Sequence, residues 1–81
     1  MDIRVAFNNL ESAFTSGDTD GITTALKKLV EGYGGSAKFC FDLGISTRTY
    51  TRYIVGSKLS ALKNRLPRIS ALVQRIDVMR L

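Results

Sequence analysis

The sequence contains no histidine and no tryptophan, and it has a single proline and a single cysteine, Cys40. A zinc site takes several cysteine or histidine ligands, and the Ser–His–Asp and Cys–His catalytic arrangements need a histidine, so both classes of site are excluded. A lone cysteine forms no internal disulfide, which favours a reducing compartment. We interpret Cys40 as a small, buried core residue. No metal, cofactor or small-molecule ligand is indicated, and we expect a protein that is not an enzyme.

Long apolar runs are also missing. No stretch approaches the roughly 20 apolar residues that a membrane-spanning helix needs. The first residues, Met-Asp-Ile-Arg, lack the basic-then-apolar pattern of a signal peptide. We therefore expect no membrane partner and an intracellular location.

Acidic residues are scarce in the second half of the chain. Residues 1–35 hold three basic and five acidic residues, whereas residues 36–81 hold nine basic and two acidic ones, for net charges of −2 and +7. So basic a segment favours a polyanionic partner, with nucleic acid preferred over an anionic membrane. A solvated basic face without a partner is the alternative.

Apolar residues recur at helical spacing along the whole chain, and no alternating strand pattern is present. The spacing predicts helices from Ile3 to Phe14, Ile22 to Tyr33, Ser36 to Leu43 and Ser46 to Val55. A fifth short helix is expected with Ser57 as its cap, and a sixth with Pro67 in its first turn. The third helix is apolar on most sides, so we expect its neighbours to bury it. The prediction is an all-α fold, a compact bundle of five or six short helices in one domain over residues 1–81.

Residues 36–56 have the organisation of a helix-turn-helix: a short apolar helix, a Gly-Ile-Ser turn, and a polar, basic helix. Cys40 is small enough for the point where the two helices cross. Gly44 can adopt the left-handed conformation that the turn requires, and Ile45 is placed to fill the core between the helices. Phe39 and Leu43 supply the apolar positions on either side of Cys40.

The second helix of this motif separates into two faces when its residues are placed at about 100° intervals. One face has no acid and consists of Thr47, Arg48, Thr51, Arg52 and Val55. The opposite face holds Tyr50, Tyr53 and Ile54. Guanidinium groups bind guanine edges, and hydroxyls bind bases or phosphates, so the first face is the candidate DNA-binding face. The tyrosines could stack on unpaired bases, but their position favours a role in the core.

Residues 39–54, Phe-Cys-Phe-Asp-Leu-Gly-Ile-Ser-Thr-Arg-Thr-Tyr-Thr-Arg-Tyr-Ile, resemble the helix-turn-helix of the lambda-repressor-like family of phage repressors and Cro-type regulators. Residues 22–33 are similar to the first helix of that family, and the step from Leu66 to Pro67 is similar to the start of its closing helix. The resemblance covers about residues 20–80 and leaves residues 1–16 as an extra N-terminal helix. Tyr50 departs from the family, which usually has Val or Ile there. Matched by position, the resemblance implies that DNA is read by Ser46, Thr47, Arg48, Thr51 and Arg52.

The residues and the resemblance together predict a sequence-specific regulator of transcription that binds double-stranded DNA. We expect a repressor of phage or plasmid type, acting by operator occupancy in the bacterial cytoplasm or nucleoid. Lys58 and Lys63, which follow the reading helix, are expected at backbone phosphates. The alternative is an architectural or accessory DNA-binding protein for replication, partition or recombination. A protein-interaction module with an incidental basic face is a third interpretation.

A homodimer is expected because one helix-turn-helix reads only a few base pairs, and two copies can read a two-fold-related site. Two elements could form the interface. One is the first helix, through the stripe of Phe7, Leu10 and Phe14. The other is the C-terminal helix, residues 67–81, which ends in Val78, Met79 and Leu81. We favour the C-terminal helix, because it follows the DNA-binding helices directly.

Overall fold

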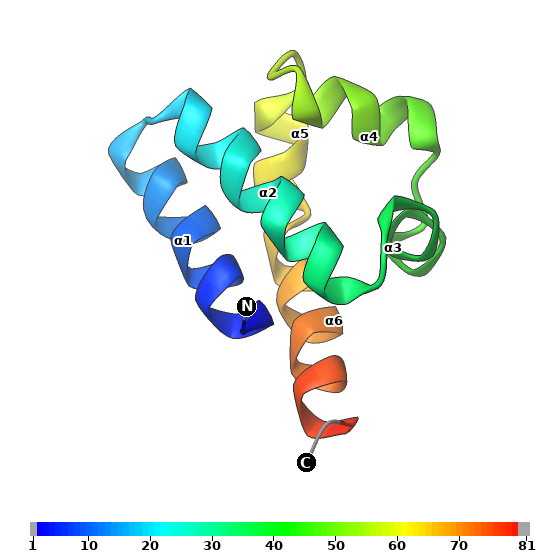
Figure 1. The fold of residues 1–81 in the computed structure, drawn as a ribbon. Helices are drawn as coiled ribbons and strands as arrows, with labels where there is room; N and C mark the ends of the chain where they lie inside the picture. The colour runs from blue at the N-terminus through cyan, green and yellow to red at the C-terminus, as the bar shows by residue number, and fades with distance from the viewer. Residues whose placement is uncertain (1, 80–81) are drawn as a thin grey trace.

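Six helices joined by short turns make up the computed structural model, which describes residues 2–79 (Figure 1). They are α1 (Ile3–Ser16), α2 (Thr19–Tyr33), α3 (Ser36–Leu43), α4 (Thr47–Ile54), α5 (Leu59–Asn64) and α6 (Leu66–Met79). Between residues 2 and 79 there is no strand. The predicted all-α bundle of short helices is therefore confirmed.

The helices α1 and α2 form an antiparallel hairpin, and α6 packs against α1 (Figure 1). The short helix α3 contacts α2, α4 and α6, while α5 packs on α6. The α1–α2 turn and α4 lie at one end of the molecule, and the C-terminal end of α6 projects from the other (Figure 1). None of the helices described here is long and apolar enough to span a membrane.

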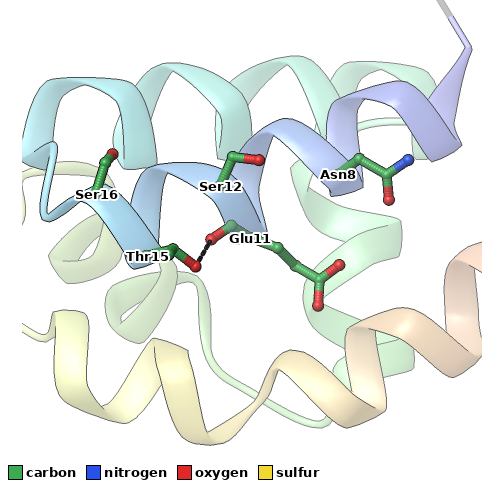
Figure 2. A pocket seen from close by; sticks show the side chains of 5 residues that line it. All are labelled: Asn8, Glu11, Ser12, Thr15 and Ser16. Atoms are coloured by element: carbon green, nitrogen blue, oxygen red, sulfur yellow. Dashed lines mark hydrogen bonds between the residues drawn. The ribbon is translucent and has the colours of Figure 1, made fainter.

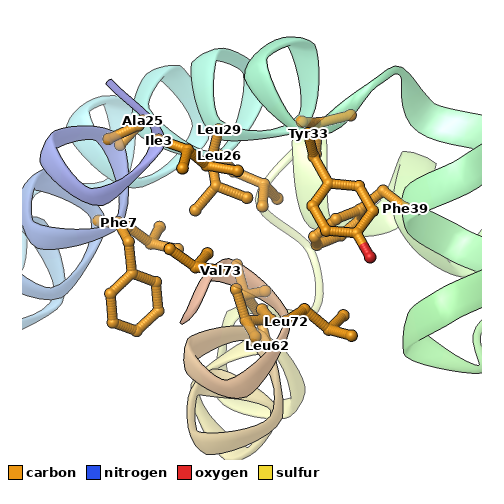
Figure 3. Packing of buried hydrophobic residues seen from close by; sticks show 14 of the residues in the cluster. Ile3, Phe7, Ala25, Leu26, Leu29, Tyr33, Phe39, Leu62, Leu72 and Val73 are labelled. Atoms are coloured by element: carbon orange, nitrogen blue, oxygen red, sulfur yellow. The ribbon is translucent and has the colours of Figure 1, made fainter. Parts of the chain in front are cut away.

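One hydrophobic cluster draws buried side chains from all six helices. Figure 3 shows part of it, with labelled side chains from α1, α2, α3, α5 and α6. Phe7 and Leu10 of α1 belong to this cluster, and Phe14 packs against its edge. The apolar stripe of α1 is therefore part of the core, where α2 and α6 cover it. This corrects the expectation that Phe7, Leu10 and Phe14 could form a dimer interface.

The expectation that Ser57 caps the fifth helix is wrong. Its amide and its hydroxyl both donate to the carbonyl of Arg52, at 3.0 and 3.2 Å, so Ser57 closes the end of α4. Gly56, with φ of 81°, reverses the chain at this point. The fifth helix begins only at Leu59, with Lys58 in the cap position and no side-chain cap bond.

The expectation that neighbours bury α3 on most sides is also wrong. Phe39, Cys40 and Leu43 point inward, but Phe41 is 85% exposed. Successive helical residues are about 100° apart, so Phe41 lies on the side of the helix opposite Phe39, Cys40 and Leu43. The apolar composition of α3 therefore overstated its burial.

Candidate nucleic-acid interface

The turn between α3 and α4 is closed by three hydrogen bonds from two amides to the end of α3. The amide of Gly44 donates to the carbonyls of Cys40 at 2.9 Å and Phe41 at 3.3 Å, and the amide of Ile45 donates to the carbonyl of Cys40 at 3.0 Å. Gly44 has φ of 77°, in the left-handed region. These bonds satisfy two terminal carbonyls, and the chain reverses within a few residues. The Gly-Ile-Ser turn therefore has the geometry that the sequence predicts.

Ser46 fixes the start of α4. Its hydroxyl oxygen accepts a hydrogen bond from the amide of Thr49 at 3.1 Å, and it lies 3.0 Å from the hydroxyl of Thr49. Such a cap satisfies one of the amides that have no partner within the helix. The predicted DNA-contacting residue Ser46 thus has a structural role as the N-terminal cap, and it is exposed.

The two faces of α4 divide as predicted. Tyr53 is buried, and Tyr50 and Ile54 are half-buried against the core. Figure 1 shows α3 nearly along its axis while α4 runs across the view, so the two helices cross steeply. The outward side chains of α4 and of its C-cap residue, all exposed, are Thr47, Arg48, Thr51, Arg52 and Val55.

Aromatic side chains from α2, α3 and α4 pack together on the inner side of α4. The ring of Phe39 meets Tyr33 edge to face, with centroids 5.6 Å apart, and meets Tyr50 with centroids 6.2 Å apart. Burial raises the pKa of Tyr50, and the nearby Cys40 raises it further. Tyr50 therefore packs α4 onto α3, although it replaces the smaller residue usual in the family that the sequence resembles. Its ring is part of the core, as the sequence predicted.

A polar contact joins α2 to α3 beside these aromatic side chains. The hydroxyl of Tyr33 donates to the carboxylate of Asp42, and the Nζ of Lys38 lies 5.5 Å from the centroid of the Tyr33 ring. Burial, and then Asp42, raise the pKa of Tyr33 to about 12, against an opposing effect of Arg75. The phenol stays protonated at neutral pH and remains a donor. The sequence predicted Tyr33 only as the last residue of the second helix, and nothing in its spacing indicated this contact.

The seven predicted DNA-contacting residues are all exposed, and they lie on two consecutive elements. The first five lie on α4 or at its start. Lys58 stands at the start of α5 and Lys63 in its last turn. Val55, which follows the last residue of α4, is exposed on the same face, as the sequence predicted, although it was not among the seven predicted contacts.

A separate surface hollow runs along α1 (Figure 2). The side chains that line it are Asn8, Glu11, Ser12, Thr15 and Ser16. All of them come from a single helix, and the hydroxyl of Thr15 donates to the carbonyl of Glu11 at 3.1 Å. The hollow is a polar helix face rather than an enclosed cavity, and none of the predicted DNA-contacting residues lines it.

No family model, no curated protein and no solved structure shows a significant match to this chain. The resemblance to the lambda-repressor-like family stays a prediction that rests on the residues of the helix-turn-helix and its flanking helices.

Proposed function

We propose that this chain is a sequence-specific regulator of transcription that binds double-stranded DNA and represses by occupying its operator. The outward face of α4 carries the proposal. This face presents the guanidinium groups of Arg48 and Arg52 with no acid among them, while the opposite face anchors the helix in the core. An α-helix fits the major groove of B-DNA, and arginine binds a guanine edge there through two hydrogen bonds.

Backbone contacts would hold α4 in register on the duplex. The amides of Thr47 and Arg48 occupy the first two positions of the helix, where the helix dipole favours a phosphate. Lys58 and Lys63 add positive charge on the next element. Phosphate contacts of this kind fix the orientation of a protein on DNA, and the base contacts provide specificity.

The two groups of cations are expected to act differently. Arg48→Ala or Arg52→Ala should cost about 1–3 kcal/mol of binding free energy on the best site and relax the preference at particular base pairs. Lys58→Ala or Lys63→Ala should weaken binding to all sequences about equally. The affinity of each variant is measured on the best site, which is selected with the wild-type chain from random duplex DNA, and on random duplexes of the same length.

The control for these variants is Lys27→Ala, an exposed lysine on α2 in the acidic half of the chain. It should leave both affinities unchanged. Equal losses on the selected and random duplexes for both arginine variants would show that α4 is not the reading helix. Coating of long DNA without a discrete footprint would favour the architectural or accessory function instead.

We also propose that the protein acts as a homodimer through the end of α6. Val78 is 67% exposed on the part of α6 that projects away from α4 (Figure 1). Met79 and Leu81, the other two apolar residues predicted for this interface, have side chains outside the described residues. Half-sites one helical turn of B-DNA apart have centres about 34 Å apart, which is the separation that the two copies of α4 would have to match.

Val78→Lys is expected to weaken dimerisation by at least about tenfold, because the contact would bury a charge in place of apolar surface on both subunits. Sedimentation equilibrium at tens of micromolar measures the effect. Val5→Lys is the matched control, because Val5 is 48% exposed on α1. A wild-type chain that stays monomeric and binds DNA as one chain per site would contradict the dimer.

A further inference from the structure

The outward face of α4 carries methyl groups beside its guanidinium groups. Thr51 and Val55 are four residues apart and therefore lie in one line along the helix. Val55 is 69% exposed although its neighbours Tyr53 and Ile54 pack inward. We call Thr51 and Val55 the methyl pair.

The hydroxyl of Thr51 is engaged within its own helix. It donates to the carbonyl of Thr47 at 3.0 Å. A threonine side chain has only a hydroxyl and a methyl group beyond Cβ. Since the hydroxyl has donated its only proton to the backbone of α4, it can only accept a further bond, and the methyl group is the apolar part of Thr51 that can meet a partner. Both members of the pair thus present apolar surface.

We propose that the methyl pair reads the 5-methyl groups of thymine in the major groove, next to the guanines bound by Arg48 and Arg52. The inference rests on the proposed function. Among the four bases only thymine places a methyl group in the major groove, and apolar side chains contact it there. Four residues span about 6 Å of helix, against about 3.4 Å between successive bases, so the two side chains can reach thymines on separate base pairs.

The experiment begins with selection of bound sequences from random duplex DNA. Each thymine of the selected site is then replaced, one at a time, by uracil, which lacks only the methyl group. Affinity should fall by about fourfold at each contacted thymine, because uracil removes one methyl group that the complex would bury. Uracil at the other thymines should have no effect.

Matched substitutions assign each methyl contact to its residue. Thr51→Ser removes the methyl group and keeps the hydroxyl bond to the Thr47 carbonyl, whereas Thr51→Val keeps the methyl group and removes the hydroxyl. The thymine-over-uracil preference at one position should disappear in Thr51→Ser and persist in Thr51→Val. Val55→Ala should abolish the preference at a second position, and Val55→Thr should retain it. Val5→Ala, on α1, is the control and should leave every preference unchanged.

The inference and the proposed function fail in different ways. A selected site that is indifferent to uracil, or that contains no thymine, would overturn the reading of methyl groups and leave sequence-specific DNA binding intact. The reverse pattern at Thr51, with the preference kept in the serine variant and lost in the valine variant, would assign the contact to the hydroxyl and also overturn it. Failure to enrich any sequence would overturn both.

Discussion

Replacing Phe39 with alanine should lower the free energy of unfolding by about 3–5 kcal/mol, the usual cost of deleting a fully buried aromatic side chain. The ring has no exposed surface and meets both Tyr33 and Tyr50 edge to face. A domain of this length is stable by about 4–12 kcal/mol in total. The variant should therefore lose between about a quarter and all of this stability, and α4 should lose its support with it.

Urea denaturation followed by circular dichroism measures this change. The chain offers its own control in Phe41→Ala, two positions further along α3. Because Phe41 is 85% exposed, this second truncation should change stability by no more than about 0.5 kcal/mol. Similar losses in the two variants would mean that α3 does not pack as described.

Affinity for duplex DNA is expected to fall about a thousandfold as salt rises from about 50 to 200 mM. Each phosphate neutralised by a lysine or arginine releases counterions and adds about −0.9 to the slope of log affinity against log salt. A dimer that neutralises roughly six phosphates should give a slope of about −5. This expectation rests on the net charge of +7 over residues 36–81.

Fluorescence anisotropy on a labelled duplex, repeated across the salt range, gives the slope directly. Lys63→Ala should make the slope shallower by about one for each phosphate that the lysine neutralises in the wild-type complex, while Lys27→Ala should not alter it. An affinity that does not change with salt would remove the nucleic-acid function altogether.

Most of the helix boundaries follow from short-range signals. Helix α3 runs from Ser36 to Leu43 as predicted, because Gly44 follows it and adopts the left-handed conformation that ends a helix. Ser46 starts α4 for an equally local reason, the bond from a nearby amide to its hydroxyl oxygen. The same reasoning gave a wrong prediction at Ser57. A serine after a helix can close that helix or cap the next one, and the turn at Gly56 places Ser57 where it closes α4.

Short-range signals also predict part of the candidate site. Helical geometry alone separates the exposed arginines of α4 from its inward-facing tyrosines. The contact between Tyr33 and Asp42 joins two different helices, and no spacing within either helix specifies it. The bond from the Thr51 hydroxyl to the Thr47 carbonyl depends on a side-chain rotamer, so the sequence could name Thr51 but not which of its groups faces outward.

The eight residues of α4 are too few to keep a helical shape alone, since isolated helices in water need about 12–15 residues. Tyr50, Tyr53 and Ile54 hold it in place from one side. The shape of the helix therefore depends on one set of side chains and its outward chemistry on another. Substitutions on the outer face can change the chemistry that this surface presents without weakening the fold. Under the proposed function, a lineage could therefore acquire new DNA specificities through single substitutions while keeping the same scaffold.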